Sequence, residues 1–309
     1  MKTLITGSEG FIGSHLCTEL ESNNHEVIRC DIAPTKPCST MDIMNLEDVK
    51  NTLKKEMPDA LINLAGQANV GLSWKRPQFT VQLNTIGLIN ILEVVREVNP
   101  RIRVIAIGSS DEYGILKENA DNISESVPVN PVTPYAISKY AQELFAKTYC
   151  RSYKMNICMV RLFNLSGDGQ AKGFLIPDIA SGIAEIEKGK RDCLSVGYLE
   201  SARDYIHVKD ACRALRLIVE KGYSGETYNI CSGVAHKGQD ILDMMIGMSQ
   251  FNINVVRDPQ KMRPSDIPVI CGNHDKLTEH TGWMPGIDFR TILYDALSYW
   301  RKQTADFDI

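Results

Sequence analysis

Three glycines close to the N-terminus, in the stretch TGSEGFIG, constrain the fold of this chain more than any other feature. The apolar run KTLIT leads into them, and FIGSHLCTELES, with apolar residues at helical spacing, follows. A strand that ends at Thr6 and a helix that starts near Phe11 put Gly7, Gly10 and Gly13 in the turn between the two. Glycine there permits a tight turn and lets the backbone approach a pyrophosphate at the helix N-terminus. An ordinary tight turn is the alternative, because glycine spacing alone is weak evidence.

An acidic residue stands where a dinucleotide-binding turn requires one. The next apolar run, EVIRC, leads to Asp31, 18 residues after Gly13. In this fold an acid about 20 residues after the glycines binds the ribose hydroxyls of the adenosine. Because a carboxylate repels a 2′-phosphate, Asp31 predicts NAD as the cofactor. Arg29 and Lys36 lie nearby, so NADP remains an alternative, and a plain turn residue is the other interpretation of Asp31.

Strand-like and helix-like segments alternate over the first half of the chain. EVIRCDI, DALINLAG, RVIAIGSS and MNICMVRLFN are strand candidates, with helices expected near 45–55, 78–98 and 134–151. The alternation predicts an α/β protein with a Rossmann-like, doubly wound parallel sheet. Glycine, proline and charge become more frequent after about residue 164, which predicts a smaller C-terminal α/β substrate-binding domain. We expect a dinucleotide-binding domain over 1–165, rejoined by about 204–235, and the smaller domain over 166–203 and 236–309.

A tyrosine and a lysine four residues apart form the candidate catalytic pair. They are Tyr135 and Lys139 in NPVTPYAISKYAQELF, where Pro134 favours a helix start. Residues at this spacing share one helix face, and a nearby ammonium group favours the phenolate and lowers the pKa of a tyrosine. The pair therefore predicts a general acid/base, although the same spacing is common by chance.

The fourth predicted strand ends in GSSDEYG, at the edge where open α/β sheets bind ligands. A hydroxyl from Ser109 or Ser110 there could hydrogen-bond a substrate carbonyl or alcohol. Asp111 and Glu112 add two carboxylates at the same place. A solvated turn is the alternative for both acids.

Composition excludes several other classes of protein. The 309 residues carry 34 Lys and Arg against 38 Asp and Glu, a formal net charge of -4, so no nucleic-acid partner is expected. No apolar run approaches the roughly 20 residues of a membrane span, and MKTLITG leaves no room for a signal peptide, so we expect a cytoplasmic protein. The 9 cysteines include no CxxC, which is typical of reduced thiols. No metal is expected, because Cys271, His274 and His280 fit no common zinc spacing.

These motifs together resemble the extended short-chain dehydrogenase/reductase family that acts on nucleotide sugars. The resemblance covers nearly the whole chain. It comprises TGSEGFIG, Asp31, NLAGQANV, GSSDEYG, PVNPVTPYAISK, RLFNLSGDGQ, ARDYIHVKDAC, YNICSG, MRPSD and TGW. The pattern is most similar to the GDP-sugar branch, which contains 4,6-dehydratases and 4-keto reductases.

The resemblance implies a role for each matching residue. Tyr135 becomes the proton donor to the sugar O4, Lys139 holds the tyrosine and the nicotinamide ribose, and Ser109 is their hydroxyl partner. The further implied cofactor contacts are Gly7, Gly10, Phe11, Ile12, Gly13, Asp31, Leu64, Ala65 and Gly66. Asp42 and Ile43, in MDIMN, are candidates for the adenine site, and an exposed loop acid is the alternative for Asp42. The implied nucleotide-sugar contacts are Gln67, Ser110, Asn164, Arg203, Arg263 and Asp266.

Two of these contacts are arginines, which suit a diphosphate because the guanidinium offers a bidentate fork. Arg203 and Arg263 are the expected diphosphate or nucleotide clamps, and Asp266 is expected to face the nucleotide ribose. A surface or interdomain ion pair is the alternative for both arginines, and for Arg203 the nearby acids are Asp204 and Asp210.

Three activities share a Tyr, Lys and hydroxyl site beside a nicotinamide. The family's dehydratases carry a glutamate where this chain has Asp111, which is one methylene shorter, and this chain is short for a dehydratase. Both features favour NAD(P)H-dependent reduction of the 4-keto group of a GDP-4-keto-6-deoxy-hexose, giving GDP-D-rhamnose. A GDP-mannose 4,6-dehydratase or a nucleotide-sugar 4-epimerase is the alternative. Asp31 disfavours the reductase, because it predicts NAD whereas such reductases often use NADPH. A non-catalytic protein on this fold would usually lack Tyr135 or Lys139.

Family members commonly form dimers through two helices of each subunit, which correspond here to 78–98 and 135–151. An apolar stripe on the first helix, formed by Leu88, Ile91, Leu92 and Val95, is the candidate homodimer face. The alternative is that this stripe packs only on its own sheet.

Overall fold

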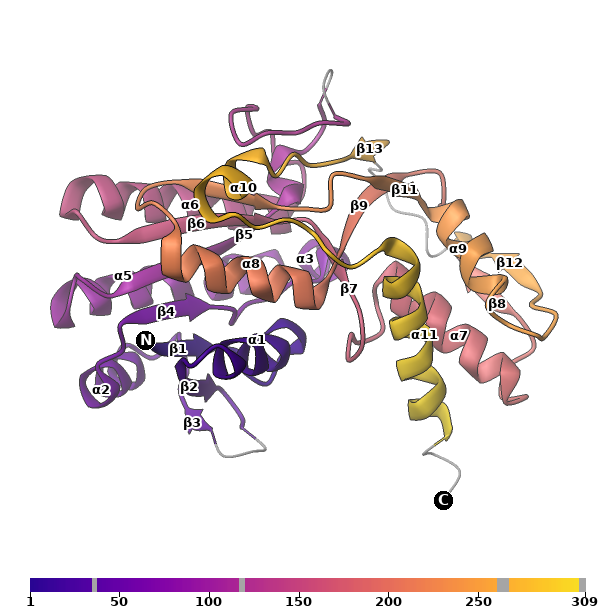
Figure 1. Ribbon diagram of the computed structural model, residues 1–309, viewed down its shortest axis with the longest axis horizontal. Helices are drawn as coiled ribbons and strands as arrows, with labels where there is room; N and C mark the ends of the chain where they lie inside the picture. The colour runs from indigo at the N-terminus through magenta and orange to yellow at the C-terminus, as the bar shows by residue number, and fades with distance from the viewer. Residues whose placement is uncertain (35–37, 117–119, 260–266, 306–309) are drawn as a thin grey trace.

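A seven-stranded parallel sheet forms the larger part of the molecule (Figure 1). The computed structural model describes residues 1–34, 38–116, 120–259 and 267–305. The strands are ordered β10-β6-β5-β4-β1-β2-β3, and the order reverses between β1 and β4, which is where doubly wound sheets bind ligands. They are β1 (Lys2–Thr6), β2 (Glu26–Asp31), β3 (Ser39–Thr40), β4 (Ala60–Asn63), β5 (Arg103–Ser109), β6 (Ile157–Leu162) and β10 (Thr227–Ile230). The predicted fold class is confirmed.

Helices cover both faces of this sheet, so its strands are almost continuously apolar. One face carries α1 (Phe11–Ser22), α8 (Val208–Lys221) and α10 (Asp275–Thr281), whose side chains share one hydrophobic core. The other face carries α2 (Leu46–Glu56), α5 (Gly87–Val98) and α6 (Pro134–Tyr153) over a second core. Every residue of β4 and β6 is buried between these layers.

The helix expected over 78–98 is interrupted. It consists of α4 (Pro77–Val81), a π-helical turn (Gln82–Ile86) and α5. A π-helical turn holds one extra residue, which re-aims the side chains that follow it and often marks a functional site. The helix expected near 134 does begin at Pro134, where Thr133 caps it by accepting the N–H of Ala136 at 3.0 Å.

The apolar stripe of α5 packs inward. Leu88, Ile91, Leu92 and Val95 are all fully buried in the core between α5 and the sheet. Their selection as the dimer face is therefore wrong, because they cover the subunit's own parallel strands.

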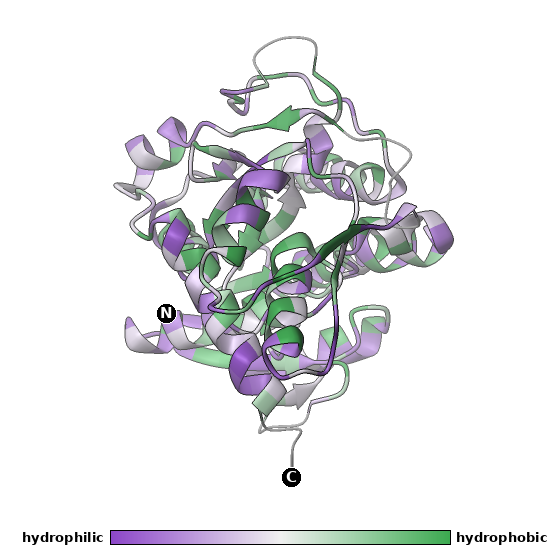
Figure 2. Cartoon of the chain, turned by 90° about the vertical axis from the view of Figure 1, so that its right-hand side faces the viewer, coloured by the Kyte–Doolittle hydropathy of each residue, from purple (hydrophilic) through white to green (hydrophobic). Residues whose placement is uncertain are grey.

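A second, smaller part of the molecule surrounds the strand β9 (Ala202–His207) (Figure 1). It includes β7 (Asn164–Ser166), β11 (Ala235–Lys237) and β13 (Val269–Ile270) around β9, and the pair β8 (Leu194–Val196) and β12 (Val255–Arg257). The helices α7 (Leu175–Glu187), α9 (Gly238–Ile246) and α11 (Phe289–Ala305) pack a third core. In Figure 2, which faces this part, its helices carry both apolar and polar residues, as expected for helices with one side buried.

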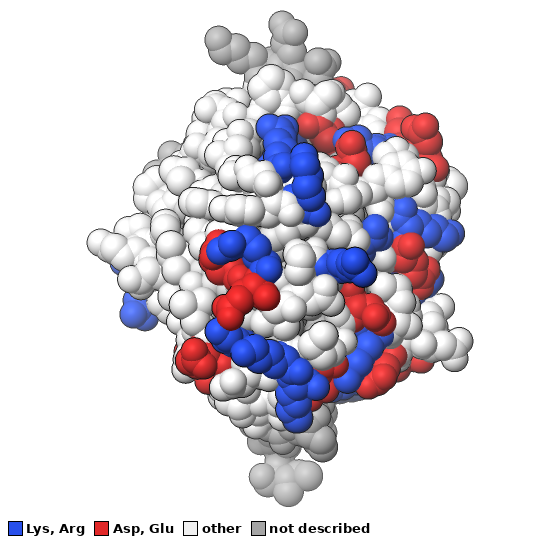
Figure 3. Space-filling view, turned by 90° about the vertical axis from the view of Figure 1, so that its left-hand side faces the viewer, with Lys and Arg blue, Asp and Glu red and all other residues white. Residues whose placement is uncertain are grey.

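The surface gives little sign of a large single-charge patch on the face that Figure 3 draws, where Lys and Arg are interspersed with Asp and Glu. Among the residues that the structure describes, no helix combines the length and apolar character needed to cross a bilayer.

Candidate active site

The glycine-rich turn connects β1 to α1 at the point where the strand order reverses. Gly7 has a left-handed φ of +67°, and a Cβ there would lie 2.9 Å from the backbone nitrogen of Ala65. A Cβ on Gly13 would lie 2.2 Å from the carbonyl oxygen of Gly7, so the turn closes only with glycine at this position. Gly10 is the residue that precedes the first turn of α1. The free N–H groups of that helical turn suit a phosphate.

Asp31 ends β2 beside this turn. Its carboxylate accepts the backbone N–H of Glu9 at 3.0 Å, which ties the strand end to the glycine turn. Arg29 is directed elsewhere, because its guanidinium pairs with Glu21 at 2.7 Å. Lys36, the other cation that could favour the 2′-phosphate of NADP, lies outside the described residues.

The remaining predicted cofactor contacts lie around the ends of β1 and β4. Phe11 and Ile12 are half-buried at the start of α1. The backbone N–H of Ala65 donates to the Thr6 hydroxyl at 3.1 Å, which holds the segment Leu64–Gly66 against β1. Asp42 accepts the N–H of Met44 at 2.8 Å, and Ile43 is buried next to α5.

Asn84, in the π-helical turn, joins this segment to the helix of the catalytic pair. Its Oδ1 accepts the N–H of Gln67 at 2.8 Å, and its Nδ2 donates to the Gln67 carbonyl and to Ser138 Oγ, both at 3.0 Å. The sequence analysis missed Asn84, because hydrophobic periodicity gives no sign of a π-helical turn. Gln67 is itself buried, and its Oε1 has no donor within reach.

Ser109, Tyr135 and Lys139 meet at the C-terminal end of β5. All three are 8% exposed. The Ser109 hydroxyl lies close enough to the Tyr135 hydroxyl to lower the pKa of Tyr135, although burial outweighs this effect. The Lys139 ammonium donates to the carbonyl oxygen of Ile107, inside β5, at 2.8 Å. Two hydroxyls and one amine are thus held together at a ligand-binding edge of the sheet.

Burial sets the protonation of this group. The pKa of Tyr135 is raised, first by burial and then by the Asp111 carboxylate. The expected lowering of this pKa by Lys139 is wrong for this structure, since desolvation of the phenolate outweighs other effects. Burial also lowers the pKa of Lys139 to about 8. Near neutral pH the tyrosine therefore holds its proton.

The four residues after β5 form a 3₁₀ turn, Ser110–Tyr113. Ser110 is buried and Asp111 is half-buried, and the N–H of Asp111 donates to Ser109 Oγ at 3.2 Å. Glu112 is fully buried, so the alternative of a solvated turn is wrong for this residue.

The predicted nucleotide-sugar contacts are only partly within the described residues. Asn164 begins β7 and Arg203 lies on β9, both half-buried. The carboxylate of Asp204 accepts the N–H groups of Ser232, Gly233 and Gly272, so it holds loops together. Asp210 pairs with Arg213 at 2.6 Å. Two further predicted contacts lie outside the described residues: Arg263 and Asp266.

Two groups of side chains were considered as metal ligands. Cys271, His274 and His280 have separate partners, namely Asp204, Thr278 and Tyr228. Within the described ranges, Asp168, His207 and Asp295 have ligand atoms within 4.8 Å of one another. The His207 Nδ1 accepts the N–H of Lys209 at 3.1 Å, so Nε2 carries the proton toward Asp295 at 3.2 Å and has no lone pair for a metal.

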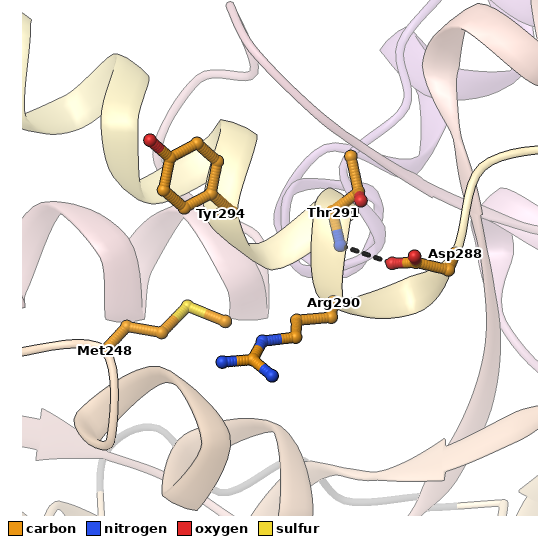
Figure 4. Close-up of a pocket in the computed structure, with 5 residues that line it drawn as sticks. All are labelled: Met248, Asp288, Arg290, Thr291 and Tyr294. Atoms are coloured by element: carbon orange, nitrogen blue, oxygen red, sulfur yellow. Dashed lines mark hydrogen bonds between the residues drawn. The ribbon is translucent and has the colours of Figure 1, made fainter.

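A separate shallow pocket of about 250 Å³ lies beside the start of α11 (Figure 4). It is lined by Met248, Asp288, Arg290, Thr291 and Tyr294. Asp288 accepts the N–H of Thr291 at 2.7 Å and so caps the helix. The pocket holds none of the predicted site residues, and we assign it no role.

A doubly wound sheet, a glycine turn at its switch point and a Ser, Tyr and Lys group at a strand end define a dinucleotide-dependent oxidoreductase. The sequence matches the family described as GDP-mannose 4,6 dehydratase over residues 4–296. The chain belongs to the extended short-chain dehydrogenase/reductase family of NAD(P)-dependent nucleotide-sugar epimerases and dehydratases. It is an enzyme that modifies nucleotide sugars.

Similar proteins share nearly the whole chain. GDP-6-deoxy-D-mannose reductase of Pseudomonas aeruginosa is 30% identical over 99% of this chain and 99% of its own length. GDP-6-deoxy-D-talose 4-dehydrogenase of Aggregatibacter actinomycetemcomitans is 31% identical over 91% of this chain and 92% of its own. The solved structure of RMD from P. aeruginosa complexed with NADPH has a TM-score of 0.88 at 30% identity, covering 98% of this chain and 100% of that one.

Proposed function

We propose that this enzyme reduces the 4-keto group of a GDP-4-keto-6-deoxy-hexose with NAD(P)H. The observation that carries the proposal is the buried group of Ser109 and Tyr135 at the end of β5, where the Tyr135 phenol can give its proton to a substrate oxygen. A reduction needs such a proton donor at the sugar oxygen. The full-length similarity to a GDP-6-deoxy-D-mannose reductase agrees with this direction.

The proposed reaction assigns each residue one task. NAD(P)H, when bound, supplies the hydride that adds to C4. Tyr135 gives its proton to O4 as the carbonyl electron pair moves onto that oxygen, which leaves an alcohol. Ser109 hydrogen-bonds the same oxygen and Tyr135, and Lys139 binds the nicotinamide ribose. The resulting phenolate regains its proton before the next turnover.

The proposed substrate contacts follow the resemblance. Arg203 and Arg263 bind the diphosphate, where a guanidinium fork suits paired phosphate oxygens. Asp266 binds the nucleotide ribose. The remaining proposed contacts line the sugar: Gln67, Ser110 and Asn164.

For the cofactor we propose NAD, with NADP as the alternative. The Asp31 carboxylate at the glycine turn disfavours a 2′-phosphate, and the nearby Arg29 is paired with Glu21. The relative that was solved with NADPH supports the alternative.

A second candidate is the GDP-mannose 4,6-dehydratase, which oxidises C4, eliminates water across C5 and C6 and returns the hydride. Asp111 favours it, because this half-buried carboxylate lies close enough to Tyr135 to raise its pKa. The shorter side chain of Asp111, compared with the family's glutamate, favours the reductase. A nucleotide-sugar 4-epimerase is the third candidate.

One experiment separates these activities. The purified protein is mixed with GDP-4-keto-6-deoxy-mannose and either NADH or NADPH, and nicotinamide absorbance and sugar NMR are followed. Stoichiometric oxidation of the cofactor with formation of a 6-deoxy-hexose supports the reductase. Absence of oxidation, with water lost from GDP-mannose in the absence of added cofactor, would establish the dehydratase instead.

We also propose a homodimer, formed through exposed apolar residues of α6 instead of the buried stripe of α5. Ile137, Leu144 and Phe145 lie on one side of α6 and are 51%, 46% and 41% exposed. Ile86, in the π-helical turn that contacts α6, is 41% exposed. A second copy of the chain would cover this apolar surface.

A further inference from the structure

A carboxyl group lies buried directly beneath the candidate catalytic residues. Glu112 is 0% exposed, and its Oε1 accepts the backbone N–H of Ser109 at 2.8 Å. A Cβ on Gly108 would lie 2.3 Å from that oxygen, so the carboxyl reaches the end of β5 only because residue 108 is glycine. Glu112 thus fixes the backbone that carries the Ser109 hydroxyl.

One buried guanidinium, that of Arg161, lies near two carboxyl groups, those of Glu112 and Glu143, and contacts them unequally. Arg161, on β6 and 3% exposed, forms a fork with Glu143 of α6 at 2.9 and 2.7 Å. Its Nε is 3.6 Å from the second oxygen of Glu112, Oε2, too far for a good hydrogen bond. Glu143 also pairs with Lys147 at 2.6 Å. The guanidinium therefore hydrogen-bonds Glu143 and only approaches Glu112, while its Nη1 has no hydrogen-bond partner.

The Oε2 of Glu112 has no hydrogen-bond partner, and the Glu143 carboxylate lies close enough to raise the pKa of Glu112. Two carboxylates in contact inside a protein cannot both stay ionised, and one proton shared between them removes the conflict. Burial and Glu143 both raise the pKa of Glu112 well above its usual value. A proton on Oε2 can be donated to Glu143.

The other ionisable groups packed around this site lie on the 3₁₀ turn and on α6. The Tyr113 ring stacks on Arg161 at 4.7 Å, and Asp111 shares its turn with Glu112. Tyr135 and Lys139 of α6 are close enough that a charge on Glu112 raises the pKa of both. An ionised Glu112 would therefore strengthen the hold of Tyr135 on the proton that it must donate.

We propose that Glu112 is a positioning residue, held as the neutral carboxylic acid, which fixes Ser109 through its backbone N–H and keeps a negative charge away from Tyr135. This inference rests on the proposed reductase activity. The contact of Glu112 with Glu143 then links the catalytic serine to α6, the helix that carries the tyrosine and lysine.

Two substitutions test the positioning. Glu112→Ala removes the acceptor for the Ser109 N–H, and we expect kcat to fall about 10- to 100-fold, because small displacements of a catalytic group have effects of this size. Glu112→Gln matches the neutral acid in shape, and we expect it to restore most of kcat and the wild-type pH profile. The control is Glu125→Gln, which alters another glutamate that accepts a backbone N–H, that of Asn229 at 2.8 Å, and should leave kcat unchanged.

A Glu112→Gln enzyme whose pH profile moves to lower pH would overturn the proposal, because it would show that the native carboxyl is ionised. Wild-type kcat in Glu112→Ala would overturn the positioning role. Infrared spectroscopy of the unliganded protein at neutral pH gives a readout without turnover. We expect a protonated-carboxyl band in the wild type that is lost in Glu112→Gln, and its absence from the wild type would refute the neutral state. This measurement is decisive even if the reductase assay shows no activity.

Discussion

Tyr135 holds its proton because it is buried beside a carboxylate, and the proposed mechanism depends on the release of that proton to a sugar oxygen. We expect Tyr135→Phe to lower kcat about 10²- to 10⁴-fold, since a positioned acid contributes a factor of this size. The ring that fills the site remains, so NAD(P)H should still bind. Turnover and the fluorescence of bound NAD(P)H measure the two effects. Retained activity on the true substrate would rule out the acid role.

Lys139 should make both the activity at alkaline pH and the free energy of unfolding depend on pH. Its pKa falls from 10.5 to about 8 in the folded protein, so the unfolded chain binds more protons between those values. Burial of the ammonium therefore costs stability below pH 8, and this cost fades as the pH rises. Lys139→Met should raise the free energy of unfolding by about 1–2 kcal/mol near neutral pH, with a smaller gain above pH 8.

Chemical denaturation at several pH values measures the gain from Lys139→Met. A gain that grows above pH 8 would contradict the buried-ammonium explanation. In the wild type, kcat/KM should decline as the pH passes about 8, because the ammonium that we propose binds the cofactor ribose is lost.

Asp31 should determine the choice between the two nicotinamide cofactors. Asp31→Ser removes the charge that repels a 2′-phosphate, and we expect the ratio of kcat/KM for NADPH to that for NADH to rise about tenfold or more. Arg29→Ala is the matched control on the same strand, because Arg29 pairs with Glu21 and should not alter the ratio. An unchanged ratio in Asp31→Ser would place cofactor choice elsewhere.

At the scale of the element, two glycines of the turn have different roles: Gly13 is needed for folding, and Gly10 for cofactor binding. A Cβ on Gly13 would lie 2.2 Å from a backbone oxygen, whereas one on Gly10 would lie 3.2 Å from it. Gly13→Ala should therefore lower the free energy of unfolding by about 2 kcal/mol or more. Gly10→Ala should keep most of the stability and weaken NAD(P)H binding, because residue 10 precedes the first turn of α1, where we propose that the phosphate binds. Thermal unfolding and cofactor titration distinguish them, and equal loss of stability in both would refute the distinction.

The elements that sequence predicted well are those with strong local patterns. The strand before Gly7, the helix from Phe11 and the helix from Pro134 have glycine, proline or threonine at their ends, and local sterics fix such boundaries. The π-helical turn around Asn84 has no such pattern, since its extra residue is stabilised by hydrogen bonds to Gln67 and Ser138, far along the chain. The burial of Glu112 escaped prediction for the same reason, because Arg161 and Glu143 come from other elements.

Over the whole molecule, the parallel sheet follows from alternating apolar strands and helices, but the smaller part does not. The strands β7, β8, β11, β12 and β13 have two or three residues each, too few for a periodic pattern. The division into domains at residues 165, 203 and 235 stays a prediction. Arg263 and Asp266, the proposed nucleotide contacts beyond the sheet, also remain predictions from the resemblance.

The apolar stripe of α5 shows why a subunit interface is difficult to predict from the sequence of one helix. A strongly apolar helix face predicts burial, but not whether its partner is the chain's own sheet or a second subunit. In α5 the stripe is used internally, which leaves the exposed Ile137, Leu144 and Phe145 of α6 for a partner. Such a contiguous apolar surface is typical of an interface.

If a second copy covers this surface, Leu144→Glu should convert a dimer into a monomer, because a buried unpaired carboxylate opposes association. The subunit itself should keep its fold, since Leu144 is 46% exposed in the isolated chain. Light scattering coupled to size-exclusion chromatography measures the mass. Thr18→Glu, on an exposed position of α1 across the sheet from α6, tests whether a new surface charge is enough by itself. A wild-type protein that elutes as a monomer would refute the dimer, and a dimeric Leu144→Glu variant would move the interface to another surface.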